Sequence, residues 1–171
     1  AEYQAILQDE LERSIVSTDA IGGMGIILEP FSGKILAMSS LPDYDSNSPS
    51  LYKREFIRNR VITDQYEPGS TFKIVPAMAA IHTGKVSLVE EFNCENGSYD
   101  FRGTTIKDWS DFSLLTFPQI IENSSNVGVI KIAVRVGAKN LYRFARKFGF
   151  GSESGISFPG EAKGRLRTVD E

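Results

Sequence analysis

Apolar residues recur every four positions near the start of the chain, with charged residues between them, at Tyr3, Leu7, Leu11 and Ile15. Residues four apart lie on the same face of a helix. Residues 1–18 are therefore predicted to form an amphipathic helix, which the glycines that follow interrupt.

Two short apolar runs come next, and a cluster of turn residues separates them. The runs cover 24–29 and 34–38, and Pro30-Phe31-Ser32-Gly33 lies between them. This arrangement predicts a β-hairpin with a loop of about four residues. A polar loop with two prolines, 39–50, follows the hairpin.

The rest of the chain alternates apolar helical segments with loops. Residues 92–107 are rich in aromatic and turn residues, so short extended pieces are expected there. Pro76 is expected to kink the first helix of this half, because proline removes one hydrogen bond from the helix ladder. A hairpin followed by several helices predicts an α+β architecture. The predicted helices are 71–81, a short helix capped by Thr116 with Pro118 in its first turn, 127–136 closed by Gly137, and 140–148 ended by Gly149.

Composition excludes several classes of function. The 171 residues correspond to one domain, and 19 basic against 22 acidic residues give a net charge of −3, which argues against a nucleic-acid-binding module. No apolar run approaches the roughly 20 residues that cross a bilayer. One cysteine (Cys94) and one histidine (His82) predict neither an internal disulfide nor a metal site, and no phosphate-binding glycine motif suggests a cofactor.

Trp109 is expected in the core, with the lining of a cleft as the alternative.

A serine and a lysine at helical spacing are the first candidate for chemistry. Ser70 and Lys73 are three apart at the start of a predicted helix, so the amine can reach the hydroxyl. The positive end of the helix and partial burial both favour the neutral amine, which can act as a base. His82 is 12 residues further along the same helix, about 18 Å from Ser70, and cannot take its proton.

The same spacing occurs once more, at Ser50–Lys53, within a polar loop bounded by prolines. We interpret that match as chance, because no apolar helix follows it. Ser70 is favoured because Glu67-Pro68-Gly69 precedes it and an apolar helix follows. The alternative for Ser70 is a simple helix cap.

A second polar constellation, Ser124-Ser125-Asn126, interrupts two apolar helical segments. Such residues usually form a loop or a cap. Beside a helix that carries Ser70 and Lys73, however, Ser124 could relay a proton between Lys73 and a leaving amine. Asn126 could hold a substrate amide and orient the lysine.

These motifs resemble the transpeptidase domain of class B penicillin-binding proteins. The segment YEPGSTFK (66–73) is followed 54 residues after Ser70 by the SSN triplet. The form of the first motif is more similar to division- or sporulation-type members. The resemblance implies a partial penicillin-binding-protein/serine β-lactamase-like fold. It extends to further stretches at 32–38, 41–47, 58–64, 148–151 and 158–161.

The resemblance also implies an activity: a D,D-transpeptidase that cross-links peptidoglycan stem peptides through an acyl-serine intermediate. By the family pattern, Ser70 attacks the carbonyl of the penultimate D-Ala, Lys73 is the base, Ser124 shuttles the proton and Asn126 contacts the substrate. β-Lactams, which mimic D-Ala-D-Ala, are expected to acylate Ser70, and no cofactor is implied. The expected location is the outer, periplasmic face of the cytoplasmic membrane, with an anchor outside this chain and cell-wall synthesis or divisome proteins as partners.

One motif of the family is missing. A K[ST]G triplet should follow well over 100 residues after the SxN triplet, but the chain ends 45 residues after Asn126. We therefore expect residues 1–171 to be the N-terminal portion of one transpeptidase domain, without the C-terminal strands of its sheet. Such a piece is expected to be inactive alone, because it lacks an oxyanion-hole donor and one wall of the cleft. Its hairpin would keep an unpaired edge that could form a homodimer.

Two alternatives remain open at this point. A class D β-lactamase or β-lactam sensor can carry the same STFK segment, but its second motif normally lacks the asparagine found at Asn126. A non-catalytic divisome scaffold of the same fold is the other alternative. A scaffold has no need of Ser70, Lys73, Ser124 and Asn126 together.

Overall fold

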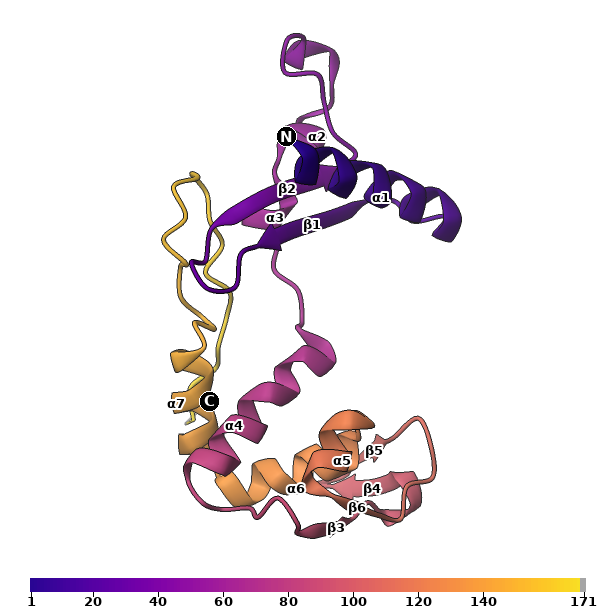
Figure 1. Cartoon of the computed structure of the whole chain (residues 1–171), viewed down its shortest axis with the longest axis vertical. Coiled ribbons are helices and arrows are strands. Elements are labelled where there is room, and N and C mark those ends of the chain that lie inside the picture. Colours follow the sequence, from indigo (N-terminus) through magenta and orange to yellow (C-terminus); the bar gives the residue numbers. More distant parts are fainter. Residues whose placement is uncertain (170–171) are drawn as a thin grey trace. The chain divides into compact units, whose positions relative to one another are not determined.

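The computed structural model describes residues 1–169 and divides into two compact units. The first unit consists of residues 1–65 and 155–162, and the second of 66–154 with the described residues from 163 onward. Helices and two-stranded antiparallel sheets occur in both units, as expected for an α+β chain (Figure 1). Within the described residues no helix has the length and apolar character needed to cross a membrane.

The first unit is built on one helix and one hairpin. Helix α1 (Glu2–Thr18) lies along the strands β1 (Gly23–Leu28) and β2 (Ile35–Leu41), which pair antiparallel (Figure 1). The predicted amphipathic helix and the predicted hairpin are thus confirmed. Among the described residues these two strands pair only with each other, so the hairpin edges are free of other strands.

Specific contacts fix α1 on the hairpin. The Gln4 side chain donates to the carbonyl of Met38 (2.8 Å) and accepts from its amide (3.0 Å), so it pairs with β2 as a strand would. Gly25 allows close packing, because a Cβ there would lie 2.8 Å from Cδ1 of Leu7. The unit is completed by short helices, namely η1 (Pro49–Leu51), α2 (Arg54–Ile57) and α3 (Arg60–Thr63).

The second unit carries two small sheets and most of the core. One sheet pairs β3 with β6 and the other pairs β4 with β5. The short extended pieces expected within 92–107 are therefore present. The elements are η2 (Gly69–Lys73), α4 (Ile74–His82), β3 (Glu91–Asn93), η3 (Glu95–Gly97), β4 (Ser98–Phe101), β5 (Thr104–Lys107), β6 (Leu114–Thr116), α5 (Phe117–Glu122), α6 (Asn126–Val136) and α7 (Ala138–Lys147).

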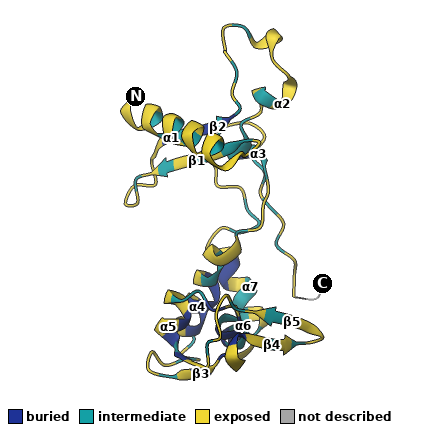
Figure 2. Cartoon of the chain, turned by 90° about the vertical axis from the view of Figure 1, so that its right-hand side faces the viewer, coloured by how far each residue is buried: buried dark blue, intermediate teal, exposed yellow. Residues whose placement is uncertain are grey.

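The core of the second unit lies among α4, α5, α6 and α7. Val75, Ile120, Val127 and Ile132 are completely buried there, and Figure 2 shows the buried positions concentrated on these helices. These side chains come from the helices that carry or flank the two predicted motifs. The core therefore sets the positions of both motifs.

The helix predicted over 71–81 begins differently from the expectation. Its first turn is the 3₁₀ helix η2, and α-helical geometry starts at Ile74. Pro76 consequently falls in the first turn of α4, where its missing N–H has no partner within the helix to lose. The sequence pattern did not distinguish a 3₁₀ turn from an α turn.

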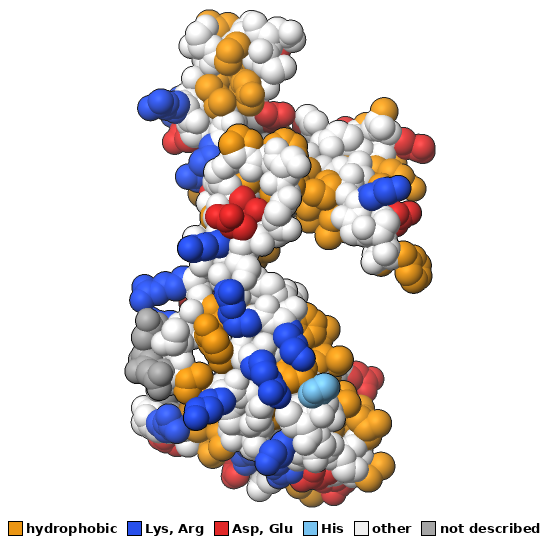
Figure 3. All heavy atoms as spheres, turned by 90° about the vertical axis from the view of Figure 1, so that its left-hand side faces the viewer, with side chains coloured by type: hydrophobic (Ala, Val, Ile, Leu, Met, Phe, Trp, Pro, Cys, Tyr) orange, Lys and Arg blue, Asp and Glu red, His pale blue; other side chains and the backbone are white. Residues whose placement is uncertain are grey.

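Helix α7 shows the strongest separation of apolar and polar faces. Phe144 and Ala145 are buried, whereas the exposed positions carry basic side chains and no acidic one. Figure 3 shows Lys and Arg side chains gathered on the viewed face of this unit. The exposed basic residues of α7 are Lys139, Arg143, Arg146 and Lys147.

Candidate active site

Lys73 of the first predicted motif contacts Ser124 of the second. Lys73 is the last residue of η2, and Ser124 lies in the turn between α5 and α6. The Lys73 ammonium nitrogen Nζ donates to Ser124 Oγ at 2.9 Å and also to the carbonyl oxygen of Ser124. Two segments 51 residues apart in sequence are thereby joined through one side chain.

Ser70 lies on the exposed side of η2, three residues before Lys73. Side chains at i and i+3 eclipse one another in a 3₁₀ helix, so this turn suits the pair better than an α-turn would. Gly69 precedes Ser70 with φ +58°, in the left-handed region that glycine adopts without strain. The described residues contain no hydrogen bond between Ser70 Oγ and Lys73 Nζ, and the two donations that Lys73 makes there both go to Ser124.

The environment of Lys73 favours its neutral form. Partial burial lowers the pKa of Lys73 from the ordinary value of 10.5, and the negative charge of Asp108 opposes this effect in part. Burial lowers the pKa because the charged ammonium loses solvation by water. The amine therefore releases its proton more readily than a lysine in solvent.

Ser124 occupies a special backbone position at the end of α5. Its φ is +53°, and the amides of Ser124 and Ser125 donate to the carbonyls of Ile121 (3.1 Å) and Ile120 (2.9 Å). This is the Schellman arrangement, in which glycine usually fills the left-handed position. A serine there is strained, and strain of this kind concentrates at functional sites. In this conformation both oxygens of Ser124 accept from Lys73.

The turn that carries Ser124 is held by Asp108, a residue that the sequence analysis missed. The Ser125 hydroxyl donates to Asp108 Oδ2 at 2.7 Å, and the amides of Asn126 and Val127 both donate to Oδ1. Ser125 Oγ in turn accepts from the amide of Gly128 at 2.9 Å. Asp108 thus caps the start of α6 from a position 18 residues earlier in the sequence. No sequence signal close to α6 identifies it.

The neighbours of Asp108 contact the same turn. Asn126 donates from Nδ2 to the carbonyl of Lys107 (2.8 Å), which leaves its Oδ1 as the available acceptor on an exposed side chain. Trp109 donates from Nε1 to the carbonyl of Asn123 at 2.8 Å, and 74% of Trp109 is exposed. The expectation that Trp109 lies in the core is wrong, because its side chain lies largely in solvent beside this turn.

His82 and the second serine–lysine match lie apart from this cluster, whereas the sulfur of Cys94 lies 3.7 Å from Ser125 Oγ. His82 ends α4, and its ring packs at 5.2 Å against Phe144. In the second serine–lysine match, exposed Lys53 forms an ion pair with Glu55. Cys94 is completely buried, and burial raises the pKa of its thiol. Within residues 1–169 no three His, Cys, Asp or Glu side chains come together in a way that could hold a metal ion.

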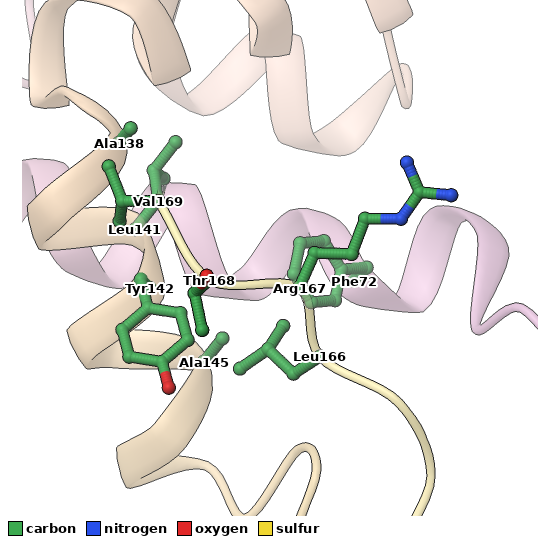
Figure 4. Close-up of a pocket in the computed structure, with 9 residues that line it drawn as sticks. All are labelled: Phe72, Ala138, Leu141, Tyr142, Ala145, Leu166, Arg167, Thr168 and Val169. Carbon is green, nitrogen blue, oxygen red and sulfur yellow. The ribbon is translucent and has the colours of Figure 1, made fainter. Parts of the chain in front are cut away.

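A separate cavity of about 210 Å³ lies between α7 and residues 166–169. Phe72 is the residue of the first motif that lines it, together with Leu141, Tyr142 and Leu166 (Figure 4). The Phe72 ring also packs at 5.0 Å against Phe150. The middle of the motif is thus anchored in apolar surroundings, while Ser70 remains exposed.

Comparison with known proteins gives a consistent family. Residues 23–170 match the penicillin-binding protein transpeptidase domain. The chain is 34% identical over 163 residues to the probable peptidoglycan D,D-transpeptidase PbpC of Pseudomonas aeruginosa, covering 95% of this chain and 29% of the relative. It is 33% identical over 173 residues to stage V sporulation protein D of Bacillus subtilis, covering 97% of this chain and 26% of the relative. It is 34% identical over 161 residues to the peptidoglycan D,D-transpeptidase FtsI of Escherichia coli, covering 94% and 27%.

Solved structures agree with these relatives. A peptidoglycan glycosyltransferase from Burkholderia ambifaria superposes with a TM-score of 0.85 at 29% identity, covering 97% of this chain and 48% of that one. The TP domain of Burkholderia pseudomallei penicillin-binding protein 3 gives 0.84 at 29% identity, covering 97% and 46%. The chain thus spans less than a third of the curated relatives named above and about half of each solved chain. The resemblance to class B penicillin-binding proteins is confirmed, and the chain belongs to the penicillin-binding protein transpeptidase family.

Proposed function

We propose that this chain forms part of a peptidoglycan D,D-transpeptidase that works through an acyl-serine intermediate. The observation that carries the proposal is the position of Lys73, whose side chain joins η2, the turn that carries Ser70, to the SxN turn. The pKa of Lys73 is also lowered. A neutral lysine beside a serine at this spacing is a known way to activate the hydroxyl. The relative from Escherichia coli is named a peptidoglycan D,D-transpeptidase and that from Pseudomonas aeruginosa a probable one, which supports the same activity.

In the proposed reaction Ser70 Oγ bonds to the carbonyl carbon of the penultimate D-Ala of a stem peptide. The hydroxyl proton passes to Lys73, and Ser124 relays it to the departing nitrogen. The peptide bond to the terminal D-Ala then breaks, and D-Ala leaves as the free amino acid. An amine from a neighbouring stem peptide then attacks the ester carbonyl and gives up one proton to Ser70 Oγ. The bond between Ser70 Oγ and the acyl carbon breaks, which leaves the new amide and the restored Ser70 hydroxyl.

Asn126 is proposed to bind the substrate in this reaction. Its Nδ2 is already used by Lys107, so Oδ1 is free to accept a hydrogen bond from a substrate amide. β-Lactams are proposed to enter the same site and remain as an ester on Ser70. The proposed location is the periplasmic side of the cytoplasmic membrane, among cell-wall synthesis and divisome proteins. Pairing of two hairpin edges into a homodimer also stays a prediction, which gel filtration tests.

Intact mass spectrometry after incubation with a penicillin tests the proposal. The samples are the longest native form of the protein, residues 1–171 alone, and the long form with Ser70→Ala. An adduct of one penicillin on the native form that is absent from Ser70→Ala supports the proposal. The 1–171 piece is expected to remain unlabelled, because it contains no K[ST]G triplet.

Other outcomes point to other functions. Rapid hydrolysis of the penicillin by the long form would favour a β-lactamase. If the long form neither labels nor consumes penicillin, and if Ser70→Ala still supports wall synthesis, a scaffold replaces the transpeptidase. Labelling of the short piece would show that the K[ST]G strand is not required for acylation.

A further inference from the structure

We propose that Asp108 is a positioning residue of this active site, whose carboxylate holds the SxN turn where Ser124 receives Lys73. The inference rests on the proposed function, because it concerns the same site. Asp108 touches neither Ser70 nor Lys73 through a hydrogen bond in the described residues. It acts through Ser125 and the first turn of α6.

The first argument is the hydrogen-bond arrangement at the start of α6. The first amides of a helix have no partner within the helix. Here the amides of Asn126 and Val127 donate to Asp108 Oδ1, and the amide of Gly128 donates to Ser125 Oγ. Because Ser125 Oγ itself donates to Asp108 Oδ2, the carboxylate supports all three amides, two directly and one through Ser125.

The second argument is that residues 107–109 hold the turn on both sides of Ser124. Lys107 accepts from the Asn126 side chain, and Trp109 donates to the carbonyl of Asn123. Ser124 therefore lies between two anchored neighbours. Ser125, the residue through which Asp108 acts, is completely buried, so it has little freedom to repack.

The third argument is electrostatic. Of the charged groups in the described part of the chain, Asp108 is the one whose charge acts on Lys73, and it raises the pKa of that lysine against the effect of burial. A carboxylate at this point also complements the positive end of α6. Removing the charge while keeping the shape should therefore make Lys73 a neutral base at lower pH.

The test compares Asp108→Asn, Asp108→Ala and the control Asp111→Asn in the longest native form. Asp111 is an exposed carboxylate three residues further along, and within residues 1–169 it makes no hydrogen bond to the turn. The measurements are the rate of acylation by a fluorescent penicillin against pH, and the thermal midpoint of each variant. Asn at position 108 keeps an oxygen for the two amides, whereas Ala removes the support altogether.

We expect three distinct results. Asp108→Ala loses about a hundredfold in acylation rate, the loss typical of a catalytic group displaced by about 1 Å. Asp108→Asn keeps more of the wild-type maximal rate than Asp108→Ala does, but the acid limb of its pH profile moves to lower pH. Asp111→Asn matches the wild type in both measurements.

A residue that only stabilises the fold would lower the thermal midpoint without moving the acid limb. An unmoved limb in Asp108→Asn, or an acylation rate of Asp108→Ala equal to that of Asp111→Asn, overturns the inference. If Asp108→Ala does not fold, the pH profile of Asp108→Asn decides alone. Absence of acylation in the wild type contradicts the proposed function instead, so the two failures are distinguishable.

Discussion

One methyl group added at Gly128 is expected to lower the acylation rate strongly while lowering the stability of the fold only modestly. A Cβ at Gly128 would lie 2.6, 2.8 and 2.9 Å from Cγ1, Cγ2 and Cδ1 of Ile120. Ile120 is completely buried and β-branched, so its side chain cannot rotate away. Either α5 or the first turn of α6 must move to accept Gly128→Ala.

The magnitude follows from two opposing terms. Alanine gains about 1 kcal/mol over glycine as a helix former. Overpacking of a filled core costs about 1–3 kcal/mol. The net loss of stability is therefore at most about 2 kcal/mol. Gly128 donates to Ser125 in the turn that presents Ser124, so displacement of about 1 Å should lower acylation about a hundredfold.

Denaturant unfolding and the rate of penicillin acylation measure the two effects on the same protein. Ile120→Ala serves as the matched partner, because it removes the atoms that the new methyl group would meet. Alone it should cost about 2–5 kcal/mol through the cavity it leaves. In the double variant the methyl of position 128 enters that space, so the double variant should be more stable than the sum of the two single effects predicts.

Two results would refute this reasoning. If Gly128→Ala gains about 1 kcal/mol and acylates at the wild-type rate, helix propensity alone decides and the contact with Ile120 is unimportant. If the two substitutions are simply additive, the methyl group and Ile120 do not share space.

Three further predictions concern single side chains. Lys73 is the proposed base and must be neutral to act, and burial lowers its pKa, so acylation should rise with pH and level off below the ordinary lysine value of 10.5; a limb centred at or above that value contradicts this. Ser124→Gly should be about 1 kcal/mol more stable than Ser124→Ala in denaturant unfolding, because only glycine relieves the left-handed backbone, while both acylate poorly; equal stabilities would mean that the φ of +53° is unstrained. Cys94 is completely buried with a raised thiol pKa, so a thiol reagent should label it only after unfolding, and rapid labelling of the folded protein would disprove its burial.

Elements whose signal lies within a few residues were predictable from the sequence. Helix α1 and the hairpin follow from local periodicity and turn residues. The start of α5 is also local, since Thr116 forms a capping box with Gln119 and Pro118 lies in the first turn. The pairing of Lys73 with Ser124 was anticipated from the two motifs together.

Features that depend on distant contacts were not predictable. Asp108 caps a helix that begins 18 residues later, and the pattern around it resembles any polar loop. The sequence favours a core position for Trp109 because large apolar side chains usually lie there, yet the side chain is largely exposed and its indole N–H donates to the carbonyl of Asn123. The 3₁₀ geometry of η2 was also not predictable, because 3₁₀ and α turns have similar sequences.

The two hydrogen bonds from Lys73 to Ser124 limit where the lysine nitrogen can accept a proton. A neutral amine has two hydrogens and one lone pair, and here both hydrogens are occupied by the oxygens of Ser124. The lone pair is then the one tetrahedral position left for an incoming proton. Once that position is filled, the ammonium keeps both of its bonds to Ser124, now strengthened by charge. Lys73 is thus both the proposed base and a link between two chain segments, and Lys73→Ala should remove the proton acceptor and this link in a single step.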